Sequence, residues 1–343
     1  MTITNLAELL SESHSDYVIY DLGRRVQAIQ ADTFKAICAQ QRPYPYPLQD
    51  HAWFAVVFWP QLKAEQPEPF LWFLKIPLDE RGLLNQATQQ DFMTHVIALL
   101  GQQITGALNA EQEQQLQQSA YLFTPSEAKR AALHAQLTQR WQKAPSRYFA
   151  AAQQELHSPT NDGWQQLGIQ GIHDVAVRLA ANPKTTQAIA QHFTSYPESL
   201  QNALAEALEH TTPPSELMQP LLSALTSEHA ATRVNALRAL AGFASDHSAA
   251  PTVEQQLHQL LPSANMDELV IITARLWPAL QGQLMLPYLL RVAELDNPAL
   301  FAGVVRDILR VPDTRIHALG LVQRNDLPVA LYQAWQQFMG KTA

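Results

Sequence analysis

The feature that most constrains the fold is a long series of segments with helical periodicity. From about residue 106 to the end of the 343-residue chain, apolar side chains recur at the spacing of one helix face, and short connections rich in Pro, Asn and Ser separate the segments. The strand pattern of the preceding residues does not return. Many short amphipathic helices with short connections are typical of a helical solenoid or a helical bundle.

The first 105 residues follow a different pattern. Candidate strands lie at 17–20, 26–29, 52–59 and 70–76, with helix-period stretches around them. The last two strands are apolar at consecutive positions, so we expect both to be buried on both faces. The sequence therefore predicts an α+β protein, in which a small antiparallel sheet with flanking helices (1–105) precedes an all-α solenoid (106–343).

An internal repeat supports the solenoid. The segments 233–241 and 301–309 share their apolar pattern and lie 68 residues apart, which is twice a helix-pair unit of 34 residues. This register places Leu237, Leu240, Val305 and Ile308 at matching core positions. It also places Arg238 on the solvent side, so we expect its loss to be tolerated.

Residues 214–244 resemble a HEAT repeat. Pro220 stands in the first helix, as it often does in that family, and Arg233 occupies the position of the family's ladder arginine. The resemblance implies stacked helices with a concave face that binds protein, and it implies no catalytic residues. The later unit departs from the pattern, because Phe301 replaces the arginine. The fold class is thus α+β with a HEAT-like helical domain at 106–343.

Two N-terminal motifs carry a second resemblance. The segments Asp-Leu-Gly-Arg-Arg at 21–25 and Tyr-Pro-Tyr-Pro-Leu at 44–48, followed by Ala52 and Trp53, are similar to an uncharacterised bacterial family of full-length proteins of unknown function. This resemblance implies a bacterial source and supplies no activity.

The first motif is a candidate binding site. Two guanidinium groups beside a carboxylate can hold an anion, with Asp21 orienting Arg24 or Arg25. The alternative is a charged turn in which Asp21 bonds to the backbone and Gly23 supplies a positive φ. Successive residues of a strand point to opposite faces, which favours the turn unless a bulge is present.

The second motif also has two interpretations. Proline holds an extended backbone, and Tyr44 and Tyr46 offer flat amphipathic faces, so the segment could bind a ligand. It could equally be a stiff connector that two tyrosines attach to the sheet. We favour the connector.

Composition narrows the function classes. A net charge of −8 argues against a nucleic-acid partner, and the single Cys38 argues against disulfides and cysteine-based metal sites. Twelve histidines form no His-x-x-x-His pair, and nucleotide-binding glycine motifs are missing, so we expect no metal and no cofactor. The sequence shows no signal peptide and no apolar run of membrane-spanning length, so we expect a cytoplasmic protein.

The C-terminal residues 282–343 carry six basic and five acidic side chains, among them Arg306, Glu294 and Asp296. They could form a patch for an acidic partner, although paired surface charges are the simpler interpretation.

These observations predict a non-enzymatic adaptor or scaffold whose partner is another protein. The alternative is a small-molecule or anion site, with catalysis left open, at the junction of the two parts around Asp21, Arg24 and Arg25. The sequence indicates neither the pathway nor the oligomeric state.

Overall fold

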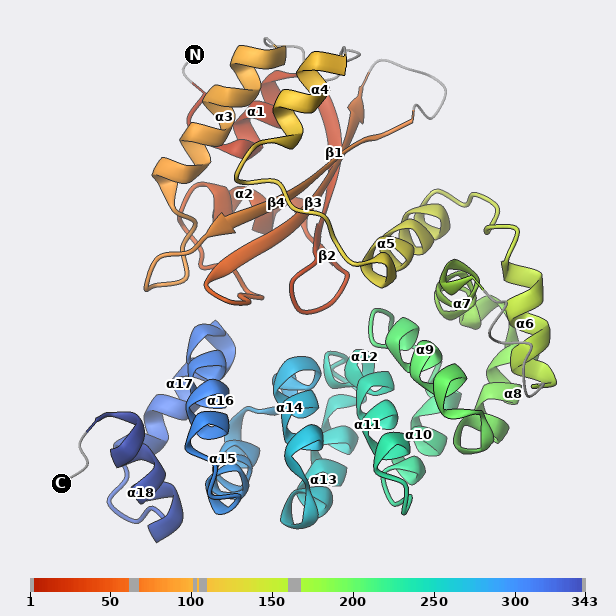
Figure 1. Ribbon diagram of the computed structural model, residues 1–343, viewed down its shortest axis with the longest axis vertical. Helices are drawn as coiled ribbons and strands as arrows, with labels where there is room; N and C mark the ends of the chain where they lie inside the picture. The colour runs from red at the N-terminus through yellow and green to blue at the C-terminus, as the bar shows by residue number, and fades with distance from the viewer. Residues whose placement is uncertain (1–2, 62–67, 101–103, 105–109, 160–167, 341–343) are drawn as a thin grey trace. The chain divides into compact units, whose positions relative to one another are not determined.

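A computed structural model describes residues 3–61, 68–100, 104, 110–159 and 168–340. The chain divides into two compact units (Figure 1). Unit 1 holds residues 1–125 with 310–312, and unit 2 holds residues 126–309 with 313–343. The boundary that we expect at residue 105 lies outside the described residues and stays a prediction. The α+β fold class is confirmed, with a small antiparallel sheet followed by a helical C-terminal region.

Unit 1 contains a four-stranded antiparallel sheet in the order β2-β1-β3-β4. The strands are β1 Ser15–Asp21, β2 Gln27–Ile29, β3 His51–Pro60 and β4 Phe70–Pro77. The helices are α1 Leu6–Glu12, α2 Ala31–Cys38, α3 Gln86–Leu100 and α4 Ala110–Gln117. One face of the sheet forms the core with these helices, through side chains that include Phe34, Val56, Trp72 and Phe92.

The expectation that both long strands are buried on both faces is confirmed for β3 and wrong for β4. Consecutive residues 54–58 of β3 are all fully buried. Strand β4 alternates instead: Trp72, Leu74 and Ile76 are buried on the face that packs against the helices, whereas the side chains between them are less buried on the other face. Residues 121–123 bond to the backbone of Phe73 and Lys75, but they do not bond to that of Leu71, which stays 41% exposed.

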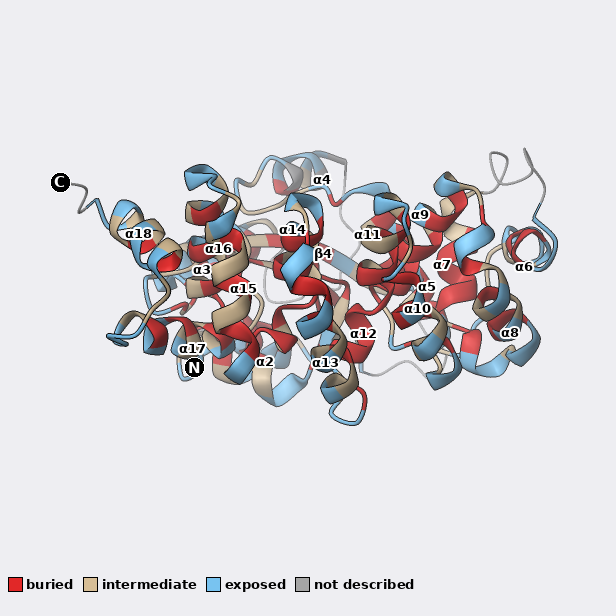
Figure 2. Ribbon diagram, turned by 90° about the horizontal axis from the view of Figure 1, so that it is seen from below, coloured by how far each residue is buried: buried red, intermediate tan, exposed pale blue. Residues whose placement is uncertain are grey.

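Unit 2 is helical throughout its described residues. Its helices are α5 Glu127–Arg140, α6 Phe149–His157, α7 Ile169–Ala176, α8 Pro183–His192, α9 Glu198–Leu208, α10 Met218–Ala224, α11 Ala230–Ala239, α12 Ala241–Ala244, α13 Ala250–Leu260, α14 Met266–Arg275, α15 Met285–Glu294, α16 Pro298–Arg310, α17 Pro312–Val322 and α18 Val329–Phe338. Helices α5, α7, α9, α11 and α14 pack side by side in that order. The buried residues lie where helices meet (Figure 2).

Local signals explain where several helices begin. The side chains of Asn5, Ser126 and Asn265 each accept a hydrogen bond from the backbone N–H three residues later, which satisfies a donor that the helix leaves unpaired. At Asn265 the side chain of Glu268 bonds back to the Asn265 N–H, completing a capping box. Short polar residues therefore begin these three helices.

The repeat register is partly confirmed. Leu237, Leu240, Val305 and Ile308 are all buried in the core of unit 2. The expected solvent position of Arg238 is wrong, because α9 packs against α11 and its carboxylates meet the guanidinium there. None of the described helices has the length and apolar content that a membrane span requires.

Candidate functional site

Asp21 organises the first motif. It ends β1, and its carboxylate accepts hydrogen bonds from the backbone N–H groups of Gly23 (2.9 Å), Arg24 (3.2 Å) and Arg25 (3.3 Å). Gly23 does not have the positive φ that we expected for this turn. The turn packs closely around it, since a Cβ there would lie 3.0 Å from Cδ1 of Trp53 and 3.1 Å from Oδ1 of Asp21, and these side chains would have to shift slightly.

The second motif packs onto the first. The hydroxyl of Tyr44 donates to Oδ1 of Asp21 at 2.6 Å, and Nε of Arg24 donates to the carbonyl of Pro47 at 2.9 Å. The ring of Tyr46 lies edge-on to that of Tyr44, with centroids 6.1 Å apart. The structure therefore brings Asp21, Arg24, Arg25, Tyr44 and Tyr46 together within unit 1.

The chemistry of this cluster is that of a buried hydrogen-bond network. Asp21, Arg24, Arg25 and Tyr44 are all buried. Burial, and then the neighbouring carboxylate, raise the pKa of Tyr44 well above its usual value, so Tyr44 remains a hydrogen-bond donor. Because the Asp21 carboxylate accepts from both the turn and Tyr44, the network holds the segment 44–48 against the end of β1.

A second polar cluster lies in unit 2, where Glu209 follows α9. Its carboxylate pairs with Nε of Arg238 at 2.7 Å and with Nε of Arg275 at 3.0 Å, and Arg238 also reaches Glu206 at 3.5 Å. Burial alone would raise the pKa of Glu209, but Arg275, His210 and Arg238 bring it down to about 2. The charged Glu209 thus links α9, α11 and α14.

Two histidines lie beside this cluster. The rings of His173 on α7 and His210 are stacked, with centroids 6.1 Å apart and planes at 15°. His173 is buried, and its Nε2 has no hydrogen-bond partner among the residues that the structure describes. Burial lowers the pKa of His173 to about 4, so the ring is neutral near pH 7.

The third feature is an open cavity of about 480 Å³ among α15, α16 and α18, which we call the C-terminal groove. Its α18 wall consists of Ala330, Gln333, Ala334, Gln337 and Phe338, which recur at the spacing of one helix face. Its other lining residues are Ala293, Glu294, Asp296, Asn297, Pro298, Phe301, Ala302 and Arg306.

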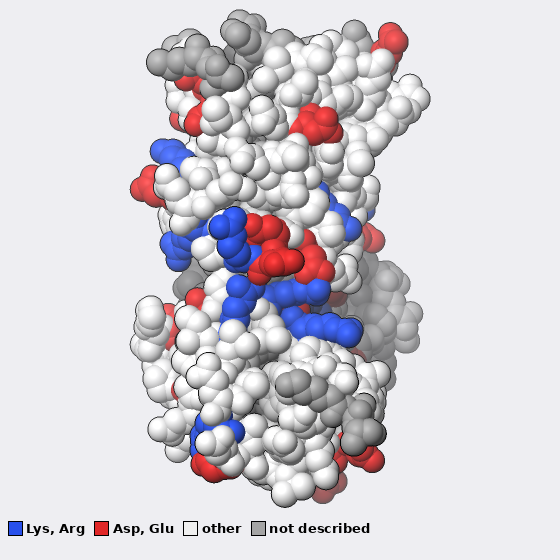
Figure 3. Space-filling view, turned by 90° about the vertical axis from the view of Figure 1, so that its left-hand side faces the viewer, with Lys and Arg blue, Asp and Glu red and all other residues white. Residues whose placement is uncertain are grey.

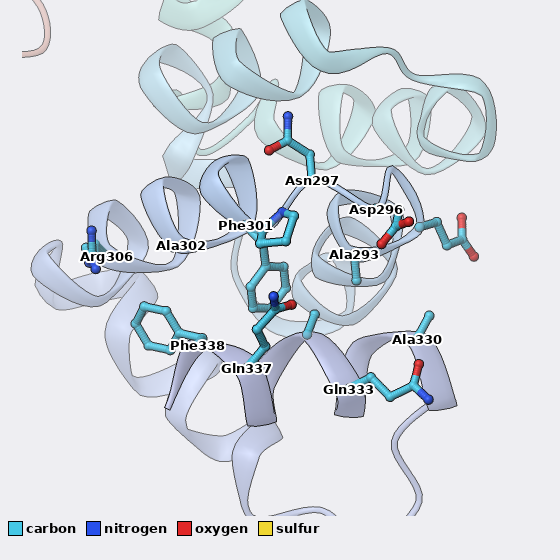
Figure 4. Close-up of a pocket in the computed structure, with 13 residues that line it drawn as sticks. Ala293, Asp296, Asn297, Phe301, Ala302, Arg306, Ala330, Gln333, Gln337 and Phe338 are labelled. Carbon is cyan, nitrogen blue, oxygen red and sulfur yellow. The ribbon is translucent and has the colours of Figure 1, made fainter. Parts of the chain in front are cut away.

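Small side chains create this groove. At its base Phe301 packs edge-on against Trp335, with centroids 5.7 Å apart, and joins α16 to α18. Above that contact both helices present alanines, Ala302 and Ala334, which leave the space between them unfilled. Figure 4 shows Phe301 and Phe338 directed toward this space.

The two ends of the groove differ in charge. Arg306 stands over the ring of Phe338, 6.0 Å from its centroid, while Asp296 lies at the opposite end (Figure 4). Glu294, two residues before Asp296, also lines the groove. Much of the face drawn in Figure 3 is neither acidic nor basic, in keeping with a chain in which 16% of residues are charged. Charged side chains at both ends of one groove are therefore distinctive here.

The C-terminal groove has the chemistry of a binding site. It combines an apolar floor, carboxamides on its walls and charges at its ends, which is the composition of many ligand and peptide sites. Within the described part of the chain, no group of three or more His, Cys, Asp or Glu side chains could hold a metal ion.

Sequence reasoning missed the Glu209 cluster, and it identified the charges Arg306, Glu294 and Asp296 without the groove that they line. The 37-residue spacing of Arg238 and Arg275 is a repeat signal that could have indicated inter-helix ion pairs. The groove has no such signal in the sequence, because an alanine that a neighbouring helix covers and an alanine that lines an open space occur in the same amphipathic pattern.

Comparison with known proteins places the chain in a family. It belongs to the family described as "Protein of unknown function (DUF3549)", whose model matches residues 1–339. The predicted membership of an uncharacterised family is therefore confirmed. No curated protein and no solved structure matches the chain.

Proposed function

We propose that this protein is a non-enzymatic adaptor that binds another protein through unit 2. The observation that carries the proposal is the C-terminal groove, an open cavity with an apolar floor among helices α15, α16 and α18. Grooves between helices commonly take an apolar face of a partner segment. Exposed apolar side chains on the last two helices, α17 and α18, add surface that a partner could cover; they are Ile316, Leu319, Val329 and Tyr332.

We also propose that unit 2 is a HEAT-like repeat array. Hydrogen bonds between side chains of helices that pack together, α9 with α11 and α11 with α14, recur at nearly constant spacing along the chain. Asn235 donates to Gln201, 34 residues earlier, and Arg233 donates to Glu268, 35 residues later. Arg233 is the residue that resembles the ladder arginine of the family. Arrays of this kind present long surfaces to protein partners.

A selection experiment tests the proposed function. A library of 16-residue peptides displayed on phage is selected on the full chain and on a variant in which Ala302→Leu and Ala334→Leu fill the groove. Leucine is a good helix former, and both positions are only partly buried, so the filled variant is expected to fold. Ala299→Leu, on an exposed face of α16 that does not line the groove, is the matched control.

We expect peptides that bind the natural chain and the Ala299→Leu control but not the filled variant. Peptides that bind all three proteins equally would show that the groove is not the binding surface. The same conclusion would follow if no peptide were enriched on the natural chain.

A further inference from the structure

The charges at the ends of the C-terminal groove are available to a partner. Asp296 and Arg306 are exposed, and neither has an ion-pair partner among the residues that the structure describes. Glu294, two residues before Asp296, forms an ion pair with Arg291 at 3.5 Å. A ligand in the groove would therefore meet Arg306 at one end and, at the other, the carboxylate of Asp296, neither of which has an ion-pair partner among the described residues.

The separation of these charges selects the size of the ligand. Asn297, at the acidic end, and Arg306 are nine residues apart, which corresponds to roughly 13 Å along a helix. The ammonium and carboxylate of a free amino acid share one carbon and cannot span that length. A peptide with side-chain charges about two helical turns apart can span it. The charge spacing therefore favours a peptide over a small zwitterion.

The walls of the groove favour a helical peptide. Both walls are helices, so their backbone groups are already hydrogen-bonded within each helix. An extended peptide would leave its own N–H and C=O groups with few partners besides the side chains of Asn297, Gln333 and Gln337. A helical peptide satisfies its backbone internally and presents an apolar stripe.

The direction of the bound helix follows from electrostatics. Helix α16 runs from the acidic end of the groove toward Arg306, and α18 runs the same way, since Phe301 contacts Trp335 and Arg306 contacts Phe338. A helix is stabilised by acidic residues near its N-terminus and basic residues near its C-terminus. The charges of such a helix match the groove when its N-terminal acidic residue contacts Arg306 and its C-terminal basic residue contacts the acidic end. The bound helix then lies antiparallel to α16.

From this we infer that the groove binds an amphipathic α-helix of a partner protein, antiparallel to α16. The partner carries an acidic residue at the start of its apolar stripe and a basic residue about two turns later. Its apolar side chains fill the space above Ala302 and Ala334. This inference rests on the proposed function and specifies the partner's chemistry.

Two synthetic 16-residue peptides of identical composition test the inference. Both are capped at their termini and share one Leu and Phe stripe; one has Glu before the stripe and Lys after it, and the other has the two charges exchanged. Binding to the full chain is measured by fluorescence anisotropy. We expect the acid-first peptide to bind about five- to tenfold more tightly at low salt, with a smaller difference at high salt.

The acid-first peptide also forms a helix more readily when free in solution, and this alone could make it bind more tightly. A charge-reversed variant of the protein controls for this effect. In the variant Arg306→Glu, Glu294→Lys and Asp296→Asn, the two ends of the groove exchange sign. Asparagine suits the positive φ of 50° at position 296. We expect the preference to invert in this variant, an effect that peptide helicity alone cannot produce.

The outcomes separate the inference from the proposed function. If both peptides bind equally and the filled variant binds neither, the groove binds protein but the charge order is wrong. The inference also fails if the preference persists unchanged in the charge-reversed variant. If neither peptide binds the natural chain better than the filled variant, the inference fails and the proposed function loses its support.

Discussion

Replacing Gly242 with alanine tests how closely α12 approaches the connecting segment 211–213. Gly242 lies in α12, and a Cβ built there would be 2.0 Å from the carbonyl oxygen of Thr211 and 2.9 Å from both Thr212 Cα and Pro213 Cδ. Atoms in packed interiors prefer separations of roughly 3.5 Å, so the backbone segments would have to move apart by more than about 1 Å. Backbone atoms, unlike a long side chain, cannot rotate away.

The size of the effect follows from two opposing contributions. Alanine has a better helix propensity than glycine by about 1 kcal/mol, which favours the substitution. Overpacking a closed site costs roughly 1–3 kcal/mol and occasionally more. Since the clash involves the backbone, we expect the upper end of that range, and a net loss of about 2 kcal/mol in the free energy of unfolding.

Gly303→Ala is the matched control, because Gly303 lies in α16 and a Cβ there meets nothing within 4 Å. We expect this variant to be as stable as the natural chain, or more stable by up to about 1 kcal/mol. Urea titrations followed by circular dichroism measure both variants. Equal stability of Gly242→Ala and Gly303→Ala would refute the close approach of α12 to residues 211–213.

Three further predictions concern unit 2. Leu240→Ala should lower the free energy of unfolding by about 2–5 kcal/mol in urea titrations, because Leu240 is fully buried, whereas Leu319→Ala on the exposed face of α17 should change it by less than about 0.5 kcal/mol. Arg238→Ala should lower the free energy of unfolding by about 2 kcal/mol. This is less than the roughly 3–5 kcal/mol lost when a buried ion pair is broken, because Arg275 still neutralises Glu209. A loss under about 0.5 kcal/mol would contradict this role of Arg238. The pKa of His173 is about 4 in the folded protein and 6.5 in the unfolded chain, so the unfolded chain binds the proton at a higher pH. The free energy of unfolding should therefore fall as the pH drops from 6.5 toward 4, by about 3 kcal/mol in total. His173→Phe should remove this part of the pH dependence in melts between pH 5 and 7, a range above that in which Glu209 titrates.

The local pattern of the chain was enough to predict most of the secondary structure and part of the core. Leu237, Leu240, Val305 and Ile308 were placed correctly because helical periodicity alone determines which side chains share a face. The sheet strands were found for the same reason, since their apolar runs are local. Asp21 and Tyr44 could be proposed as site residues from their motifs, although the bond between their side chains joins residues 23 positions apart.

The surroundings of each helix or strand face depend on which elements pack against it, and only the tertiary structure determines this packing. Arg238 has a position that periodicity would place in solvent, yet the packing of α9 against α11 brings Glu206 and Glu209 to it. Strand β4 has the composition of a doubly covered strand, but only the face that packs against the helices is fully buried. The C-terminal groove exists because α15, α16 and α18 meet around a space that their alanines do not fill. The sequence pattern of one helix does not show which of its small side chains a neighbouring helix leaves uncovered.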